Sequence, residues 1–308
     1  MKPSYINLIE TGEIKEKIKL LYNVLKNCEL CPRKCGVNRL KGEKGICKGG
    51  KNIAVSSFFP HFGEESVLVG KNGSGTIFLS NCNLRCVYCQ NYEISHLGIG
   101  NEYSEKDVAE MMLELQAIGC HNINLVTPTH YTPQLVKAIK IAGENGLKLP
   151  IVWNCSGYES VKIVKILDGV VDIYMPDIKY GSNKGGKRYS FPPVPDYWDR
   201  CREAVKEMHR QVGDLKIGKD GLAFKGLLIR HLVLPNGISE SEKVLRFIAK
   251  EISPNSFVNI MPQYRPEGKV LLEPEKYPEL SRRILREEYE KVINYAAKLK
   301  LTRGLELA

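Results

Sequence analysis

The chain has no run of about 18 apolar residues, the length that a membrane-spanning helix needs. Residues 1–6 also lack the apolar core of a secretory signal. Ten cysteines in 308 residues are too few for a disulfide scaffold, and seven of the ten fall between Cys28 and Cys89. Clusters of this kind indicate metal or redox chemistry more often than disulfides. We therefore expect a cytoplasmic protein that contacts no membrane.

Two further absences limit the partners and the fold. The formal net charge is +10, but the lysines are spread along the chain, and no basic motif with interleaved aromatic residues of the RNA-binding type is present. The sequence therefore gives little support for a nucleic-acid partner. No G-x-G-x-x-G follows the first expected strand, so the nucleotide-binding signature of an open α/β sheet is missing.

From residue 76 onward, short apolar runs alternate with longer helical patterns. Strands are expected at residues 76–80, 122–127, 149–153, 171–175, 226–234 and 257–261. Helices are expected at 105–118, 133–145, 159–167, 197–211 and 239–250, with one or two more in 278–299. Six β-then-α units in series imply parallel strands joined by right-handed crossovers. An open doubly wound sheet and a partial barrel both satisfy this pattern.

The N-terminal part differs from the rest of the chain. Residues 7–26 show an amphipathic helical pattern. A segment with the spacing C-x2-C-x3-C-x11-C follows, formed by Cys28, Cys31, Cys35 and Cys47. Four cysteines at near-ligand spacing indicate a metal, and zinc or an iron–sulfur cluster would use the same ligands. We therefore divide the chain into residues 1–55, a helix with a metal-binding segment, and residues 56–308, the catalytic core.

A second cysteine motif follows the first expected strand directly. Cys82, Cys86 and Cys89 have the spacing C-x3-C-x2-C among polar residues that suit a loop lining a site. Three thiolates this close can hold a [4Fe–4S] cluster, which usually takes four Cys ligands. If no fourth protein ligand arrives, one iron stays open to bind a small molecule. A zinc site and a packed trio of thiols are the weaker alternatives.

Polar residues gather where the expected strands end, which is where barrel enzymes carry their function. They lie at 127–131, 154–157, 177–180 and 262–265, with Arg230 and His231 inside the fifth strand. A polar rim shared by several strand ends predicts a site better than any single residue does.

The run around Cys82, with Tyr88 just before the third cysteine, closely resembles the radical S-adenosylmethionine (SAM) enzymes. In that superfamily the open iron binds the amino and carboxylate groups of SAM. One electron from the cluster then cleaves SAM to a 5′-deoxyadenosyl radical. The resemblance implies an α/β fold, a partial (β/α)6 radical SAM barrel. It also implies a [4Fe–4S] cluster and S-adenosyl-L-methionine as cofactors, and an electron donor such as flavodoxin or ferredoxin.

A narrower resemblance covers most of the chain from Cys28 onward. Residues 73–95, 177–179, 208–213 and 230–235 are similar to an uncharacterised group related to pyruvate formate-lyase activating enzyme. In activating enzymes a D-x-K motif and an Arg on a later strand help to hold SAM. By position these are Asp177, Lys179 and Arg230. Asn154 and Ser156 are placed to reach the ribose.

The sequence departs from activating enzymes at two places. Residues 127–130, Thr-Pro-Thr-His, stand where a G-G-E motif is usual, and Tyr264 stands where a His is frequent. The leading prediction is therefore a glycyl-radical-activase-like enzyme that abstracts hydrogen from a protein or peptide, without a named target. An RNA-modifying radical SAM enzyme and a non-catalytic iron–sulfur electron carrier remain as alternatives.

Overall fold

Strands in the described residues, 2–305, form one nine-stranded sheet in the computed structural model. Its order is β3-β1-β2-β4-β5-β6-β8-β7, and β9 also pairs with β8. The strands are β1 (Ile53–His61), β2 (Ser74–Leu79), β3 (Asn101–Tyr103), β4 (Ile123–Val126), β5 (Ile151–Cys155), β6 (Ile173–Pro176), β7 (Lys216–Ile217), β8 (Ala223–Leu232) and β9 (Phe257–Met261). The pairings β2–β4, β4–β5, β5–β6, β6–β8 and β8–β9 are parallel, which confirms the six predicted units.

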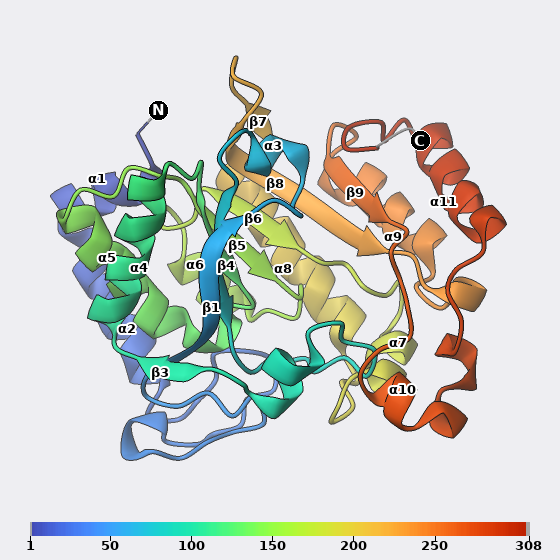
Figure 1. Cartoon of the computed structure of the whole chain (residues 1–308), viewed down its shortest axis with the longest axis horizontal. Helices are drawn as coiled ribbons and strands as arrows, with labels where there is room; N and C mark the ends of the chain where they lie inside the picture. The colour runs from blue at the N-terminus through green and yellow to red at the C-terminus, as the bar shows by residue number, and fades with distance from the viewer. Residues whose placement is uncertain (1, 306–308) are drawn as a thin grey trace.

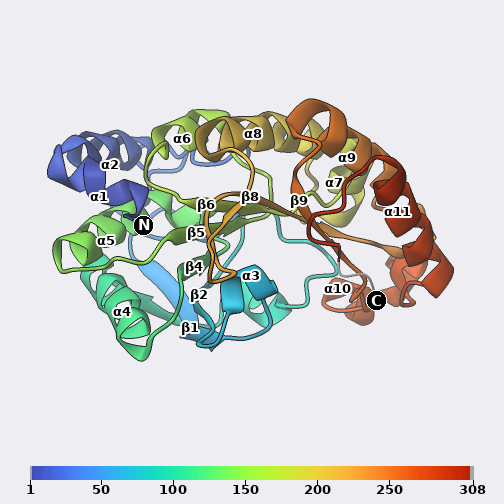
Figure 2. The ribbon, with the colours of Figure 1, turned by 90° about the horizontal axis from the view of Figure 1, so that it is seen from above.

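The α-helices are α1 (Ser4–Glu10), α2 (Glu13–Val24), α3 (Ser66–Val69), α4 (Glu105–Ile118), α5 (Thr132–Glu144), α6 (Val161–Ile166), α7 (Asn183–Tyr189), α8 (Tyr197–Val212), α9 (Ser241–Phe247), α10 (Lys269–Leu272) and α11 (Arg286–Lys298). Figure 1 shows the strands in the middle with helices on both flanks. Seen from above, the sheet curves into an arc with most helices along its outer side and α3 on its inner side (Figure 2). Within residues 2–305 the arc does not close, because no ladder joins β9 to β1 or β3. The fold is the predicted partial barrel.

One local prediction needs correction. The helical pattern of residues 7–26 is two helices, because Gly12 takes a left-handed conformation (φ 81°) between them. The expectation of one or two closing helices in residues 278–299 is confirmed, with a 3-10 turn at Pro278–Leu280 and the α-helix at 286–298. The glycine-rich stretch after residue 181 forms α7.

The inner side of the arc changes from apolar to polar along the strands. Near their amino ends an apolar cluster includes Leu68 of α3 with Val152, Ile173, Met175 and Leu228. Side chains alternate between the two faces of a strand, so residues two positions further on face the same side. These residues are Asn154, Asp177 and Arg230. The fold thereby gathers predicted site residues at the carboxyl ends of the strands.

The N-terminal helices belong to the same core as the sheet. Buried Tyr5 and Leu21 share the main apolar cluster, and the Tyr5 hydroxyl donates to the carbonyls of Leu147 and Leu149 at 3.1 and 3.0 Å. Strand β1 begins at Ile53, so the four-cysteine segment lies between two elements of the barrel. No helix in residues 2–305 combines the length and hydropathy needed to cross a bilayer.

Candidate active site

The loop after β2 presents the three predicted cluster ligands. The backbone N–H groups of Leu84 and Arg85 both donate to the Cys82 sulfur at 3.4 Å. The Ser95 hydroxyl donates to the Cys89 sulfur at 3.1 Å. Arg85 adopts a left-handed conformation (φ 55°), which turns the loop back on itself. Hydrogen bonds to sulfur favour the thiolate and tune a bound cluster.

Burial sets the protonation of these thiols. It raises the pKa of Cys86 to about 12 and also raises those of Cys82 and Cys89. The ammonium of Lys179 acts in the opposite direction on all three. The metal-free site therefore carries thiols, and binding of iron as thiolate complexes releases protons.

The donor set of the loop fits a [4Fe–4S] cluster. Across residues 2–305, no group of three or more His, Cys, Asp or Glu side chains is arranged to hold a single metal ion. The loop offers three sulfurs, with N–H and O–H donors already directed at those of Cys82 and Cys89. A four-iron cluster is larger than an ion and takes its ligands from thiolates, which is the donor set present here.

The D-x-K motif lies beside this loop. Asp177 and Lys179 form an ion pair of 2.6 Å at the end of β6, with side chains 23% and 16% exposed. Burial works to lower the pKa of Lys179, but the charges of Asp177 and Cys86 hold it well above its usual range. The fold therefore brings a permanent cation and a carboxylate to the cysteine loop, as the sequence predicts.

Arg230 has partners that the sequence did not reveal. Its guanidinium forms a bidentate pair with Glu65, at 2.7 and 2.6 Å, and a further ion pair with Glu64. Asn259 on the next strand donates to Glu65 at 2.7 Å. Burial opposes ionisation of Glu65, but Arg230 lowers its pKa below the usual value. That Arg230 contacts SAM stays a prediction.

Asn154 and Ser156 lie at the end of β5, each 8% exposed. The Ser156 hydroxyl is buried without a hydrogen-bond partner among the described residues. After it, Gly157 has φ 75°, and a Cβ there would lie 2.4 Å from the Asp177 carbonyl oxygen. A glycine is thus required where β5 and β6 meet, and Ser156 faces the site with free hydrogen-bonding capacity.

The loop that replaces the G-G-E motif is buried. Thr127 has φ 61°, a costly conformation for a β-branched residue and one that marks functional segments. His130 is also buried, at 1% exposed. Its Nε2 donates to the Ser80 carbonyl at 2.9 Å, which leaves Nδ1 without a partner among the described residues. Burial lowers the pKa of His130 to about 3, so the imidazole is neutral.

Tyr264 packs against the cysteine loop. Its ring lies edge-on to that of Tyr88, with centroids 5.8 Å apart, and its hydroxyl donates to the Leu280 carbonyl at 2.7 Å. The residue that departs from the activating-enzyme pattern therefore packs against Tyr88, the residue before the third cysteine.

Glu159 makes the stability of the folded protein depend on pH. It is 2% exposed, accepts a hydrogen bond from Thr129, and burial raises its pKa to about 8. An unfolded Glu titrates at a pH of about 4.3. Between that pH and pH 8, Glu159 is ionised in the unfolded chain but protonated in the folded one. The free energy of unfolding therefore falls as pH rises through this window, with a limiting slope of about 1.4 kcal/mol per pH unit. We expect Glu159→Gln to remove this contribution.

The measurement is the apparent Tm of anaerobic protein at pH 5.5 and pH 8. Glu159→Gln should lose less stability between these values than the wild type does. The exposed Glu114→Gln is the control and should behave as the wild type. An identical pH response in all three proteins would show that Glu159 ionises freely in the fold.

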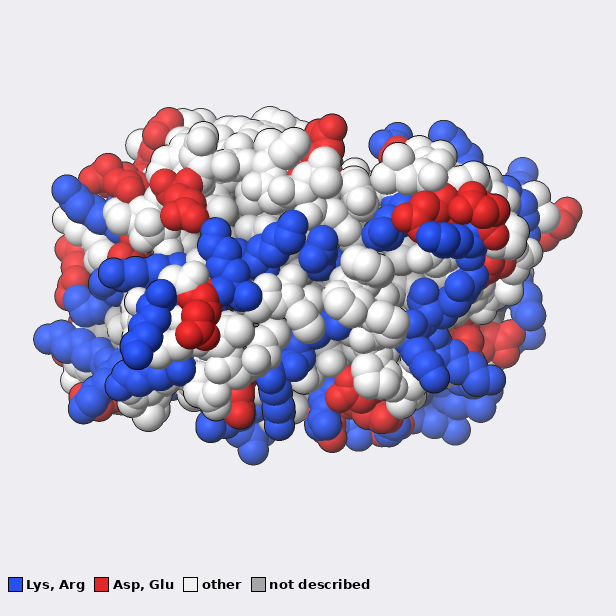
Figure 3. Space-filling model, turned by 90° about the horizontal axis from the view of Figure 1, so that it is seen from below, with Lys and Arg blue, Asp and Glu red and all other residues white. Residues whose placement is uncertain are grey.

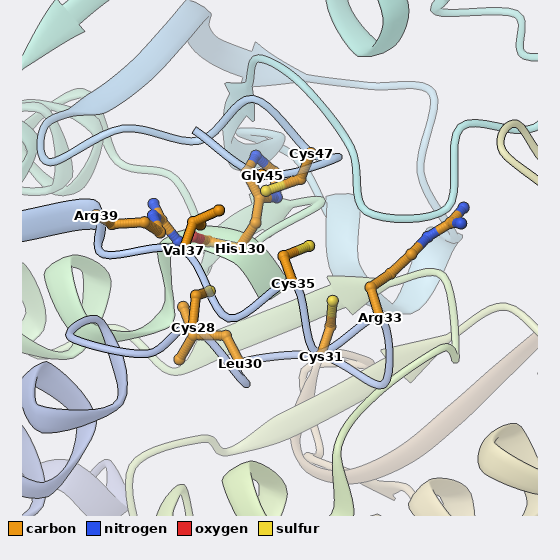
Figure 4. A pocket seen from close by; sticks show the side chains of 10 residues that line it. All are labelled: Cys28, Leu30, Cys31, Arg33, Cys35, Val37, Arg39, Gly45, Cys47 and His130. Atoms are coloured by element: carbon orange, nitrogen blue, oxygen red, sulfur yellow. The ribbon is translucent and has the colours of Figure 1, made fainter. Parts of the chain in front are cut away.

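The four N-terminal cysteines surround one cavity. Cys28, Cys31, Cys35 and Cys47 line it together with Leu30, Arg33, Val37, Arg39, Gly45 and His130. Figure 4 shows side chains from the N-terminal segment and from the loop after β4 around this space. Burial raises the pKa of Cys31 well above its usual value, and the neighbouring Cys47 raises it further. The structure thus brings together all four cysteines of the N-terminal motif.

Arg39 is a buried cation beside these thiols. Its side chain is 1% exposed and donates to the carbonyls of His130 and Gly50. No carboxylate within residues 2–305 forms an ion pair with it, whereas its charge lowers the pKa of Cys47 against the effect of burial. A buried charge is costly unless it is compensated. Two carbonyls and the ring of Tyr131, 5.8 Å from the guanidinium carbon, face this charge, which also favours the thiolate form of Cys47.

Comparisons with known proteins point to one superfamily. The profile described as the Radical SAM superfamily matches residues 76–221. The uncharacterized protein MJ0674 of Methanocaldococcus jannaschii is 35% identical over 311 residues, covering 98% of this chain and 81% of the relative. The uncharacterized protein MJ0808 of the same organism is 25% identical over 196 residues, covering 58% of this chain and 56% of the relative.

Solved structures also resemble the chain. Native anSMEcpe with bound AdoMet aligns with a TM-score of 0.46 at 13% identity, over 71% of this chain and 57% of that one. Native anSMEcpe with bound AdoMet and the Cp18Cys peptide aligns with a TM-score of 0.40 at 14% identity, over 65% and 55%. The chain thus spans little more than half the length of the solved structures it matches.

Proposed function

Because the chain belongs to the radical SAM superfamily, we propose that it cleaves SAM reductively and abstracts a hydrogen atom from a protein or peptide. The observation that carries this proposal is the loop with Cys82, Cys86 and Cys89, which lies against the Asp177–Lys179 pair at the strand ends. When bound, a [4Fe–4S] cluster and SAM supply a 5′-deoxyadenosyl radical.

The chain's own residues have separate tasks in this proposal. The three cysteines hold the cluster, and Lys179 compensates part of its negative charge. Asp177 offers an acceptor for an ammonium or hydroxyl group, and the Ser156 hydroxyl offers a donor whose hydrogen bond is not used within residues 2–305. These groups match the carboxylate, ammonium and ribose of SAM in charge and hydrogen bonding. Asn154 completes the polar rim of β5.

A polypeptide substrate suits the mouth of the site. Helix α7 joins the cysteine loop, since the N–H of Val87 donates to the Tyr189 carbonyl at 2.9 Å and a single β-bridge pairs Cys86 with Ser190. The helix exposes Lys184 and Lys187. Exposed cations next to the reactive centre favour an acidic or extended polypeptide. A role as a glycyl-radical activase is one form of this proposal.

We also propose that the four N-terminal cysteines hold a second metal centre. The support is Arg39, whose buried charge is compensated when metal binding converts the thiols to thiolates. RNA modification is the second candidate function, with the lysines of the N-terminal segment as a grip on phosphates. It would be favoured by substrate affinity that falls steeply with salt.

Deuterium transfer into 5′-deoxyadenosine tests the function. The anaerobically reconstituted protein would be given SAM, dithionite and either perdeuterated total protein or perdeuterated total RNA. We expect label in 5′-deoxyadenosine from the protein fraction only. Label from RNA alone would show that the substrate is RNA and not protein. If no 5′-deoxyadenosine forms at all, a non-catalytic iron–sulfur electron carrier would be favoured.

A further inference from the structure

The two cysteine segments are in direct contact. Arg33, which lies between Cys31 and Cys35, donates to the carbonyls of Asn83 and Leu84 at 2.9 and 3.3 Å. Both acceptors belong to the loop between Cys82 and Cys86. One side chain therefore links the N-terminal four-cysteine motif to the loop that begins with Cys82.

Two more contacts connect the segments on other sides. Arg85, next to Cys86, donates to the carbonyl of Ile46, next to Cys47, at 3.4 Å. His130 lines the four-cysteine cavity and donates to Ser80 at 2.9 Å, two residues before Cys82. Each of these routes crosses from one cysteine motif to the other through a single side chain, so both centres would lie within a short, buried distance of each other.

The outside of the four-cysteine segment is strongly basic. It exposes Lys34, Lys41, Lys44, Lys48 and Lys51, against the acidic Glu29 and Glu43. Only Lys44 among these lysines has an ion-pair partner in the described part of the chain, Glu102 at 3.9 Å. The segment lies at the face seen from below, where Figure 3 shows many Lys and Arg side chains. Such a surface attracts acidic partners and speeds their association.

We propose that Cys28, Cys31, Cys35 and Cys47 hold a [4Fe–4S] cluster that takes electrons from an acidic donor protein docked on these lysines and passes them to the Cys82 site. The inference rests on the proposed function, because it concerns the reduction that precedes SAM cleavage. The inference also identifies the metal at the four N-terminal cysteines as iron. Zinc has no redox chemistry, so a zinc ion at this position could not take part.

The electrons balance without further reactants. The donor loses one electron, the cluster at the four cysteines gains it and then loses it, and the cluster at Cys82 ends with it. No bond forms or breaks in this relay, and no proton has to move. Each SAM cleavage consumes one such electron. The route needs only the contacts made by Arg33, Arg85 and His130 between the two segments.

The first test changes only exposed side chains. Reduced flavodoxin, an acidic one-electron donor, would be mixed with the protein, and bleaching of the iron–sulfur absorbance would be followed. We expect Lys34→Glu/Lys41→Glu/Lys48→Glu to lower the second-order rate at least about 10-fold at low ionic strength, with a smaller effect at high salt. Reduction by dithionite, which needs no docking surface, should stay unchanged.

A matched control changes three exposed lysines elsewhere, Lys71→Glu/Lys216→Glu/Lys219→Glu, which lie around the amino ends of the strands. It should retain the wild-type rate with flavodoxin. Equal slowing of both variants, or no slowing of the first, would overturn the docking site. If dithionite fails to drive SAM cleavage in the wild type, the proposed function fails instead.

The second test is metal analysis. Wild-type protein should contain about eight iron atoms per chain and Cys28→Ser about four, as two clusters and one cluster require. Reduced flavodoxin should also bleach the iron–sulfur absorbance of the variant much more slowly than that of the wild type. One zinc and about four irons in the wild type would overturn the relay. The lysine variants keep the proposal testable if Cys28→Ser does not fold.

Discussion

Replacing Cys82 by alanine is expected to abolish reductive SAM cleavage. The Cys82 sulfur accepts two backbone N–H groups, from Leu84 and Arg85. Losing it leaves two protein ligands for a cluster that needs at least three. The loss should exceed the roughly 100-fold cost of removing an outer-shell partner from a metal site. Formation of 5′-deoxyadenosine with dithionite is the measurement.

The variant should also lose about four irons per chain, the content of one cluster, so the effect can be seen without an activity assay. Cys120→Ala is the matched control, because Cys120 is a free cysteine that lies after α4, outside both cysteine motifs. It should retain the iron and the activity of the wild type. SAM cleavage that survives Cys82→Ala would contradict the assignment of the loop as the cluster site.

Local patterns explain why the strands and the cysteine loop could be predicted. Each parallel strand is a short apolar run that ends in polar residues, and the spacing of Cys82, Cys86 and Cys89 is contained within eight residues. Such signals depend only on neighbours in the sequence. The same holds for α4, whose capping box between Ser104 and Asp107 fixes its start where the pattern predicts it.

The missed elements depend on contacts that the sequence does not display. Gly185 and Gly186 resemble loop residues, yet they belong to α7. A Cβ at Gly185 would lie 2.3 Å from the Tyr180 ring, and one at Gly186 would lie 2.4 Å from the Cβ of Tyr197. The glycines therefore allow close packing of a helix. Burial of His130 has a similar cause, since Ser80 and Arg39 hold it from segments far apart in the chain.

Site residues also divide into those that local sequence patterns identify and those that depend on contacts between distant segments. The D-x-K motif could be carried over by resemblance, and the fold does bring it to the cysteine loop. The partners of Arg230 could not be found in that way, because Glu65 is 165 residues away in sequence. One signal did exist. Glu64 and Glu65 interrupt an apolar stretch before α3, and a buried Arg in an apolar strand requires negative partners of this kind.

Replacing Arg230 by methionine is expected to destabilise the fold strongly. The arginine is 14% exposed, and the Glu64 and Glu65 side chains that it pairs with are each 5% exposed. Removing one partner of a buried pair leaves an uncompensated charge, which costs about 3–5 kcal/mol. Two carboxylates would remain here, so the upper part of that range is expected. Urea unfolding of the anaerobic protein measures the change in the free energy of unfolding.

A second substitution separates this effect from lost packing. Arg230→Met/Glu65→Gln should recover part of the stability, because it removes one of the two buried carboxylates that Arg230→Met leaves unpaired. Arg286→Met is the control, since Arg286 is 90% exposed and its pair with Glu290 should contribute less than about 1 kcal/mol. If Arg230→Met costs no more than this control, the Glu64–Glu65–Arg230 group does not hold the open side of the barrel together, and Arg230 is free to bind SAM.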